Sequence, residues 1–168
     1  MNYTIRNAML EDLPRIEEIF AYARQFMTDN GNPDQWGKTY PPHEQLMADI
    51  AASVLYVVTE EAVIHGVFYF SLGEDPTYTE IYDGSWRSQE PYGTIHRIAS
   101  TGVQHGIFEK VLAWCTHRCA NIRIDTHQAN QKMIHLIDKA GFHRCGIIYT
   151  HNGTKRIAFQ RCKKVLNE

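Results

Sequence analysis

The chain has 168 residues, of which 43% are hydrophobic, and a formal net charge of -2 at pH 7. This length and apolar content predict a single domain over residues 1–168 with a substantial core. Acidic and basic residues are interspersed, so we expect no broad basic surface for nucleic acid. No apolar run approaches the length of a membrane span and the N-terminus lacks a signal-peptide pattern, which favours a cytoplasmic protein without a membrane partner.

Hydrophobic periodicity and turn-forming residues predict strands and helices along the whole chain. In the first half, the expected elements are a strand at 3–6, a helix capped by Asp12, a loop at 29–36, a short helix after Pro42 and a hairpin of 53–59 with 63–70. In the second half, they are a long connection at 71–92, a strand at 93–100, a helix at 107–119, a strand at 122–126, a helix at 130–140 and a hairpin of 145–150 with 156–161. This order predicts an α/β fold in which about four helices flank both faces of a mixed, mostly antiparallel sheet of about seven strands.

Two glycines, Gly102 and Gly106, lie between the strand expected at 93–100 and the helix expected at 107–119. Backbone N–H groups that converge at a helix N-terminus form a natural cradle for phosphate. Glycines at such a position also serve simply to reverse the chain. The spacing by itself leaves both interpretations open.

The cysteines are expected to be reduced thiols, because they are scattered through a chain that is large enough not to need disulfides. They are Cys115, Cys119, Cys145 and Cys162. His117 lies between two of them on an expected helix, but it would face away from both. We therefore expect no metal site.

The stretch that begins at Asn130 has an apolar residue three positions later, Met133, and ends in Lys-Ala-Gly-Phe at 139–142. This pattern resembles the C-terminal signature of the GNAT superfamily of N-acetyltransferases. The expected order of elements is also similar to that of the family, so the resemblance covers nearly the whole chain. It implies the GNAT fold and acetyl-CoA as cosubstrate.

The resemblance implies that the cofactor lies against the glycine loop, the strand at 93–100 and the start of the helix at 130–140. Its diphosphate would be held by the backbone N–H groups of Gln104, His105, Gly106, Ile107 and Phe108. Its pantetheine arm would meet backbone groups of Ile98 and Ala99, where the two central strands separate, and the side chains of Asn130 and Met133. Asn130 also suits a helix N-cap. Val103 and Phe108 depart from the family's usual loop pattern.

A general base should matter most for catalysis, because an acceptor amine with a pKa of about 10.4 must lose a proton before it attacks. His96 is the first candidate, since a histidine has an unperturbed pKa of about 6.5, and a histidine that merely packs on the sheet is the alternative. Strand alternation predicts that His96 and Arg97 point to opposite faces, so that only one of them enters a given cleft. Asp125 and His127 are second candidates.

The acid that many family members use is absent, because Ile137 stands where they have a tyrosine seven residues after the asparagine. Three explanations remain open. The thiolate leaves unaided, a hydroxyl such as that of Tyr149 or Tyr92 supplies the proton, or the protein binds acyl-CoA without turnover.

The resemblance therefore implies transfer of an acetyl group to a primary amine of a small molecule or peptide, by direct attack in a ternary complex. The alternative is a non-catalytic acyl-CoA-binding or sensor domain of the same fold. Two interpretations remain open for the aromatic residues in the connections: they line the acceptor pocket, or they pack in the ordinary way. These residues are Trp36, Tyr40, Tyr78, Tyr82 and Trp86, with the acidic residues Asp34, Glu80 or Asp83 nearby. Whether two copies form a homodimer is left open.

Overall fold

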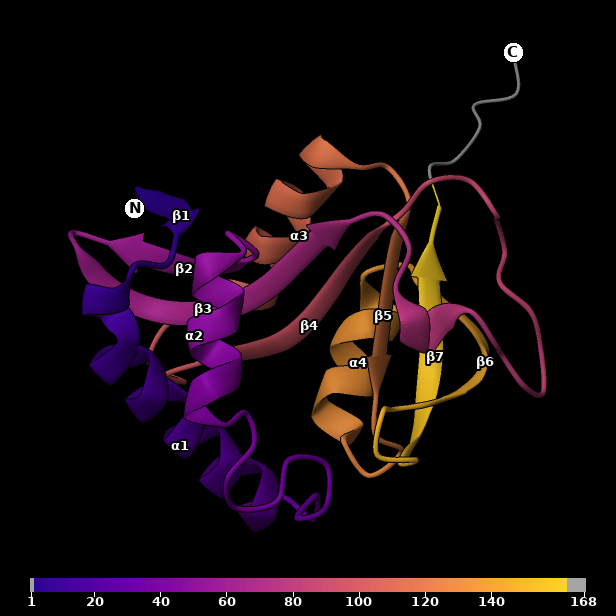
Figure 1. Cartoon of the computed structure of the whole chain (residues 1–168), viewed down its shortest axis with the longest axis horizontal. Helices are drawn as coiled ribbons and strands as arrows, with labels where there is room; N and C mark the ends of the chain where they lie inside the picture. The colour runs from indigo at the N-terminus through magenta and orange to yellow at the C-terminus, as the bar shows by residue number, and fades with distance from the viewer. Residues whose placement is uncertain (1, 163–168) are drawn as a thin grey trace.

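The computed structural model describes residues 2–162, so residues 1 and 163–168 of the expected domain lie outside the described residues. A single seven-stranded sheet runs through the molecule with helices on both of its faces (Figure 1). The strands are β1 (Tyr3–Asn7), β2 (Leu55–Glu60), β3 (Val63–Leu72), β4 (Gly93–Ser100), β5 (Ile122–Thr126), β6 (His143–Tyr149) and β7 (Lys155–Arg161). The helices are α1 (Leu13–Asp29), α2 (His43–Ala51), α3 (Ile107–Arg118) and α4 (Gln131–Lys139), with single 3₁₀ turns at Leu10–Asp12 and Pro76–Tyr78.

The sheet has the strand order β1-β2-β3-β4-β5-β7-β6. Every neighbouring pair is antiparallel except β4 and β5, which are parallel and joined through α3. The predicted fold class and order of elements are confirmed. No helix in residues 2–162 is both long and apolar enough to cross a membrane.

Two apolar clusters hold the helices on opposite faces of the sheet. Ile16 and Phe20 of α1 pack with Leu46 of α2 against one face. Val111 of α3 and Ile137 of α4 pack against the other. These side chains are almost fully buried, at 1% exposure or less, so both layers exclude water.

Details at several element starts differ from the sequence predictions, such as the starts of β6 at His143 and β7 at Lys155, and two of the differences have a local cause. Asp12 precedes α1 as expected, but its carboxylate forms an ion pair with Arg6 at 2.7 Å instead of capping the helix. The second strand begins at Leu55 and not at residue 53, because Ser53 has a left-handed φ of 56° in the turn after α2. Neither change alters the topology.

The central parallel pair is short, and this is the feature that positions the site. β4 and β5 are paired only from Gly93 to Ile95, opposite Ile122 to Ile124. Beyond these residues the two strands separate, as Figure 1 shows. The predicted separation of the central strands is thus present, and a cavity lies there.

Candidate functional site

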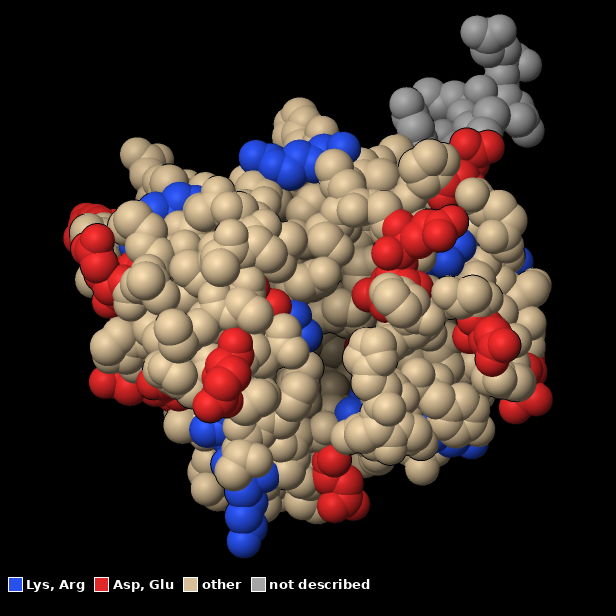
Figure 2. All heavy atoms as spheres, in the orientation of Figure 1, with Lys and Arg blue, Asp and Glu red and all other residues tan. Residues whose placement is uncertain are grey.

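A cavity of about 900 Å³ lies where β4 and β5 separate. Its walls come from the α1–α2 connection, α2, β4, β5, the start of α4 and the β6–β7 turn. The molecular surface is hollowed between the two halves of the sheet, and both acidic and basic side chains surround the hollow (Figure 2). A volume of this size is typical of sites for small molecules and cofactors.

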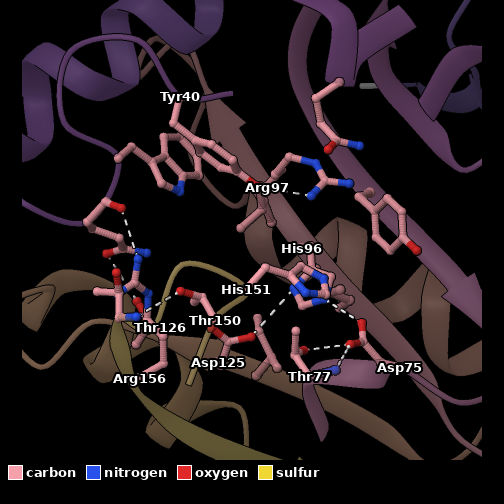
Figure 3. A pocket seen from close by; sticks show the side chains of 18 of the residues that line it. Tyr40, Asp75, Thr77, His96, Arg97, Asp125, Thr126, Thr150, His151 and Arg156 are labelled. Carbon is pink, nitrogen blue, oxygen red and sulfur yellow. Dashed lines mark hydrogen bonds and ion pairs between the residues drawn. The ribbon is translucent and has the colours of Figure 1, made fainter. Parts of the chain in front are cut away.

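A bulge in β4 sends two consecutive polar side chains, those of His96 and Arg97, into the cavity. His96 pairs with Tyr69 and Ala99 pairs with Val67, so two residues of β4 lie opposite one residue of β3. Arg97 is the extra residue, and its φ of 47° is left-handed. The prediction that His96 and Arg97 point to opposite faces is therefore wrong, because a bulge interrupts the alternation on which it rested. Both side chains line the cavity (Figure 3).

His96 is held between two carboxylates. Its Nε2 lies 2.7 Å from Oδ2 of Asp75, and its Nδ1 lies 3.5 Å from Oδ2 of Asp125. The Tyr78 hydroxyl donates to the same Asp125 oxygen at 2.6 Å. Because a carboxylate only accepts hydrogen bonds, the contact with Asp75 places the proton of the neutral ring on Nε2 and leaves the lone pair on Nδ1. Figure 3 shows His96 between Asp75 and Asp125.

The environment fixes the charge states around this histidine. Burial alone would raise the pKa of Asp75, but the hydrogen bond and charge of His96, together with two hydrogen bonds from Thr77, lower it to about 2. Burial and then the charge of Asp125 raise the pKa of Tyr78 well above its ordinary value of 10.0. At neutral pH, Asp75 is therefore an anion and Tyr78 a neutral donor.

Arg97 has its own set of partners on the opposite wall. Nε and Nη2 contact Oδ2 of Asp49 at 2.9 and 2.8 Å, and Nη1 donates to the Tyr40 hydroxyl at 3.1 Å. The guanidinium also lies over the ring of Tyr69, 4.6 Å from its centroid. The charge of Arg97 is thus compensated within the protein, and its role is to anchor α2 to β4.

The glycine loop joins β4 to the N-terminus of α3, and its residues are not part of the cavity lining. Gly106 is the residue before α3 and has a left-handed φ of 78°. The backbone N–H groups of Gln104, His105 and Gly106 donate no hydrogen bond to any other residue in the described part of the chain. Lys110, one turn into the helix, brings its ammonium group to 3.4 Å from the His105 carbonyl. Free amides and a positive charge fit a bound phosphate.

Val103 and Phe108, the two residues that depart from the family pattern, do not cover the backbone N–H groups of this loop. The Phe108 side chain is 5% exposed and packs in the core under α3, and not over the loop. Val103 is 73% exposed. Ile107, between the loop and the core, is also buried.

The remaining predicted cofactor residues divide between the cavity and the core. Ile98, Asn130 and Met133 line the cavity. Asn130 caps α4 by accepting a hydrogen bond from the Met133 N–H at 3.2 Å and also donates to Gln35 at 3.0 Å, so the predicted cap is present and its contact with the pantetheine arm stays a prediction. Ala99 is buried against α1 and does not line the cavity, although the adjacent Ile98 does.

Neither candidate hydroxyl for the acid lines the cavity. Tyr149 is 47% exposed, and its ring packs edge-on against Tyr82 on the outer surface. The alternation of β6 instead turns Ile148 toward the cavity. Tyr92 is buried, and its hydroxyl accepts the backbone N–H of Asp75. Ile137, where the family has its tyrosine, is fully buried in the core.

The other candidates are distributed on both sides of the cavity wall. Asp125 lines the cavity, whereas His127 does not. The Nδ1 of His127 accepts a hydrogen bond from the backbone N–H of Ala129. Of the aromatic and acidic residues in the connections, the cavity is lined by Trp36, Tyr40 and Asp34. The others lie elsewhere, with Tyr78 and Trp86 buried behind the wall and Tyr82 joined to Glu80 on the surface.

Sequence reasoning missed Asp75 and Arg156, which both line the cavity. Asp75 lies in the connection before β4, where no periodic pattern marks it. A usable signal was the Asp-Pro-Thr sequence at 75–77, because an aspartate before proline commonly caps a turn and is then held in a fixed orientation. Arg156 carries no comparable local signal.

The fold and the cavity at the separated central strands define the class of protein, an α/β protein with the fold of the GNAT acetyltransferases. A GNAT-family acetyltransferase from Streptococcus agalactiae superposes with a TM-score of 0.81, at 27% identity over 96% of each chain. A GNAT-family acetyltransferase from Listeria monocytogenes has a TM-score of 0.69, at 15% identity over 95% of this chain and 94% of that one.

A third structure, that of yncA from Salmonella typhimurium, was solved with its cofactor acetyl-CoA. It has a TM-score of 0.60, at 18% identity over 98% of this chain and 96% of that one. No family sequence model and no curated protein sequence matches the chain. The predicted resemblance to the GNAT superfamily is confirmed by the structural neighbours.

Proposed function

We propose that the protein is an acetyl-CoA-dependent N-acetyltransferase that acts on a primary amine of a small molecule or peptide, by direct attack in a ternary complex. The observation that carries this proposal is the placement of His96, bound to Asp75, in a cavity at the separation of β4 and β5. The similarity to acetyltransferases, one of them solved with acetyl-CoA, supports it.

The residues around the separated strands fit acetyl-CoA. The free N–H groups of Gln104, His105 and Gly106, with Lys110 beside them, would hold the diphosphate. Ile98, Asn130 and Met133 would contact the pantetheine arm. Acetyl-CoA, once bound, supplies an acetyl group activated as a thioester.

His96 suits the role of general base. An alkylammonium with a pKa of about 10.4 costs roughly 4 to 5 kcal/mol to deprotonate at neutral pH. In our proposal, the lone pair on Nδ1 takes this proton, because Nε2 already donates to Asp75. The resulting imidazolium would then be stabilised by the carboxylates of Asp75 and Asp125 on its two sides.

The leaving group needs less help than the amine. A thiol has a pKa of about 8.5, so its thiolate is only moderately basic at neutral pH. Because Tyr149 and Tyr92 do not line the cavity, we propose that the thiolate leaves without a proton from either residue. The nitrogen releases its second proton to solvent as the amide forms, and solvent protonates the thiolate afterwards.

The second candidate function is an acyl-CoA-binding domain without turnover, and the buried Ile137 at the family's acid position favours it. Calorimetry with acetyl-CoA, combined with an assay for free thiol in the presence of a panel of amines, separates the two. Amine-dependent thiol release that His96→Gln abolishes supports the transferase. Tight binding without release from any amine contradicts it and favours the sensor.

A further inference from the structure

Arg156 is a buried arginine whose hydrogen bonds leave most of its donors unused. It lies at the second position of β7, lines the cavity and is 7% exposed. Nη2 donates to the Gln35 carbonyl at 2.9 Å and Nη1 donates to the Lys155 carbonyl at 3.1 Å. A guanidinium has five N–H donors, and the other three have no partner within residues 2–162.

Arg156 forms no ion pair with a carboxylate in the described part of the chain, whereas Arg97 is paired with Asp49. Burial lowers the pKa of Arg156, and the nearby negative charge of Asp125 offsets this only in part. Buried charges in proteins are normally paired. A buried guanidinium that faces a cavity and meets only neutral carbonyls is therefore suited to an anion that enters from outside.

The sheet register places this arginine beside the proposed catalytic group. Asp125 of β5 lies opposite Ala158 of β7, and Arg156 is two residues from Ala158, on the same face of the sheet. Arg156 and Asp125 are thus diagonal neighbours, for which Cα atoms are roughly 7–8 Å apart. Because Asp125 also approaches His96, the three side chains run in a line across β4, β5 and β7 (Figure 3).

We propose that Arg156 binds a carboxylate of the acceptor, so that the acceptor is an amino acid whose amine points toward His96. This inference rests on the proposed acetyl transfer. The planar fork of a guanidinium matches the two oxygens of a carboxylate, and the bidentate pair fixes the orientation of the molecule that carries it. Asp125, between the two ends, repels a misplaced carboxylate and attracts the ammonium form of the amine.

The test compares α- and ω-amino acids with their primary amides, which keep the size and remove the charge. For each pair, kcat/KM is measured by thiol release with acetyl-CoA, for the parent, Arg156→Met and Arg156→Lys. Arg144→Met is the matched control, because Arg144 is an exposed arginine on the adjacent strand β6 and lies outside the cavity lining. Calorimetric titration of the same pairs into protein saturated with coenzyme A gives a readout that needs no turnover.

We expect the ratio of acid to amide to fall by roughly 10- to 100-fold in Arg156→Met, to recover partly in Arg156→Lys, and to stay unchanged in Arg144→Met. Each acid differs from its amide in amine basicity, but this difference is the same for every protein variant. It therefore cancels when the acid-to-amide ratio is compared between variants. If no pair is acetylated but the titration shows the same dependence on Arg156, the carboxylate site stands and the proposed transfer fails. An equal loss for acids and amides, or no preference for acids in either assay, overturns the inference and leaves Arg156 as a support for the Gln35 loop.

Discussion

Asp75 offers a test of the electrostatics at the site, because its pKa falls from its ordinary value of 3.8 to about 2. Its side chain is 11% exposed, so solvent screens the interaction little. At 1.36 kcal/mol per pH unit, this lowering corresponds to roughly 2 kcal/mol of folding free energy. Since the folded-state pKa is depressed, that stability is present above about pH 4 and is lost as the pH falls toward 2. Asp75→Asn removes the charge and keeps the shape.

We expect Asp75→Asn to be roughly 2 kcal/mol less stable than the parent at pH 6, and the difference to shrink as the pH falls from 4 toward 2. Urea unfolding, followed by circular dichroism at several pH values, measures the difference. Glu74→Gln is the control, because Glu74 is the adjacent residue and is exposed. A difference between parent and Asp75→Asn that is constant over the whole pH range would refute the reasoning, since it would show that packing and not charge is lost.

Three further experiments test the catalytic base, the loop and the anchor of α2. His96→Gln should lower kcat/KM for the preferred amine by at least about 100-fold while acetyl-CoA affinity is kept, and a change below about threefold would exclude a base. Gly106→Ala and Gly153→Ala, at φ of 78° and 79°, should each lose about 1 kcal/mol of stability, but only Gly106→Ala should weaken coenzyme A in calorimetry. Asp49→Ala leaves the half-buried Arg97 unpaired and should cost about 3 kcal/mol in urea unfolding; a cost near zero would show that Tyr40 suffices.

The sequence determined the order of the elements, because strands and helices follow from local periodicity and turn residues. The bounds predicted for β4 and β5 agree with the structure, as does the start of α3 after Gly106. Asn130 was also identified correctly as a helix cap, since an N-cap is a contact between residues three apart. These features depend on neighbours in the chain.

The composition of the cavity was decided only by the tertiary structure. Arg97 turns inward because β3 imposes a bulge on β4, and a bulge depends on the register of two strands. Asp75 and Arg156 reach the cavity from segments about eighty residues apart, and Tyr149 is turned away from it by the alternation of β6. Which charged groups meet in a cavity depends on contacts between distant segments, and the local pattern of a sequence holds no record of those contacts.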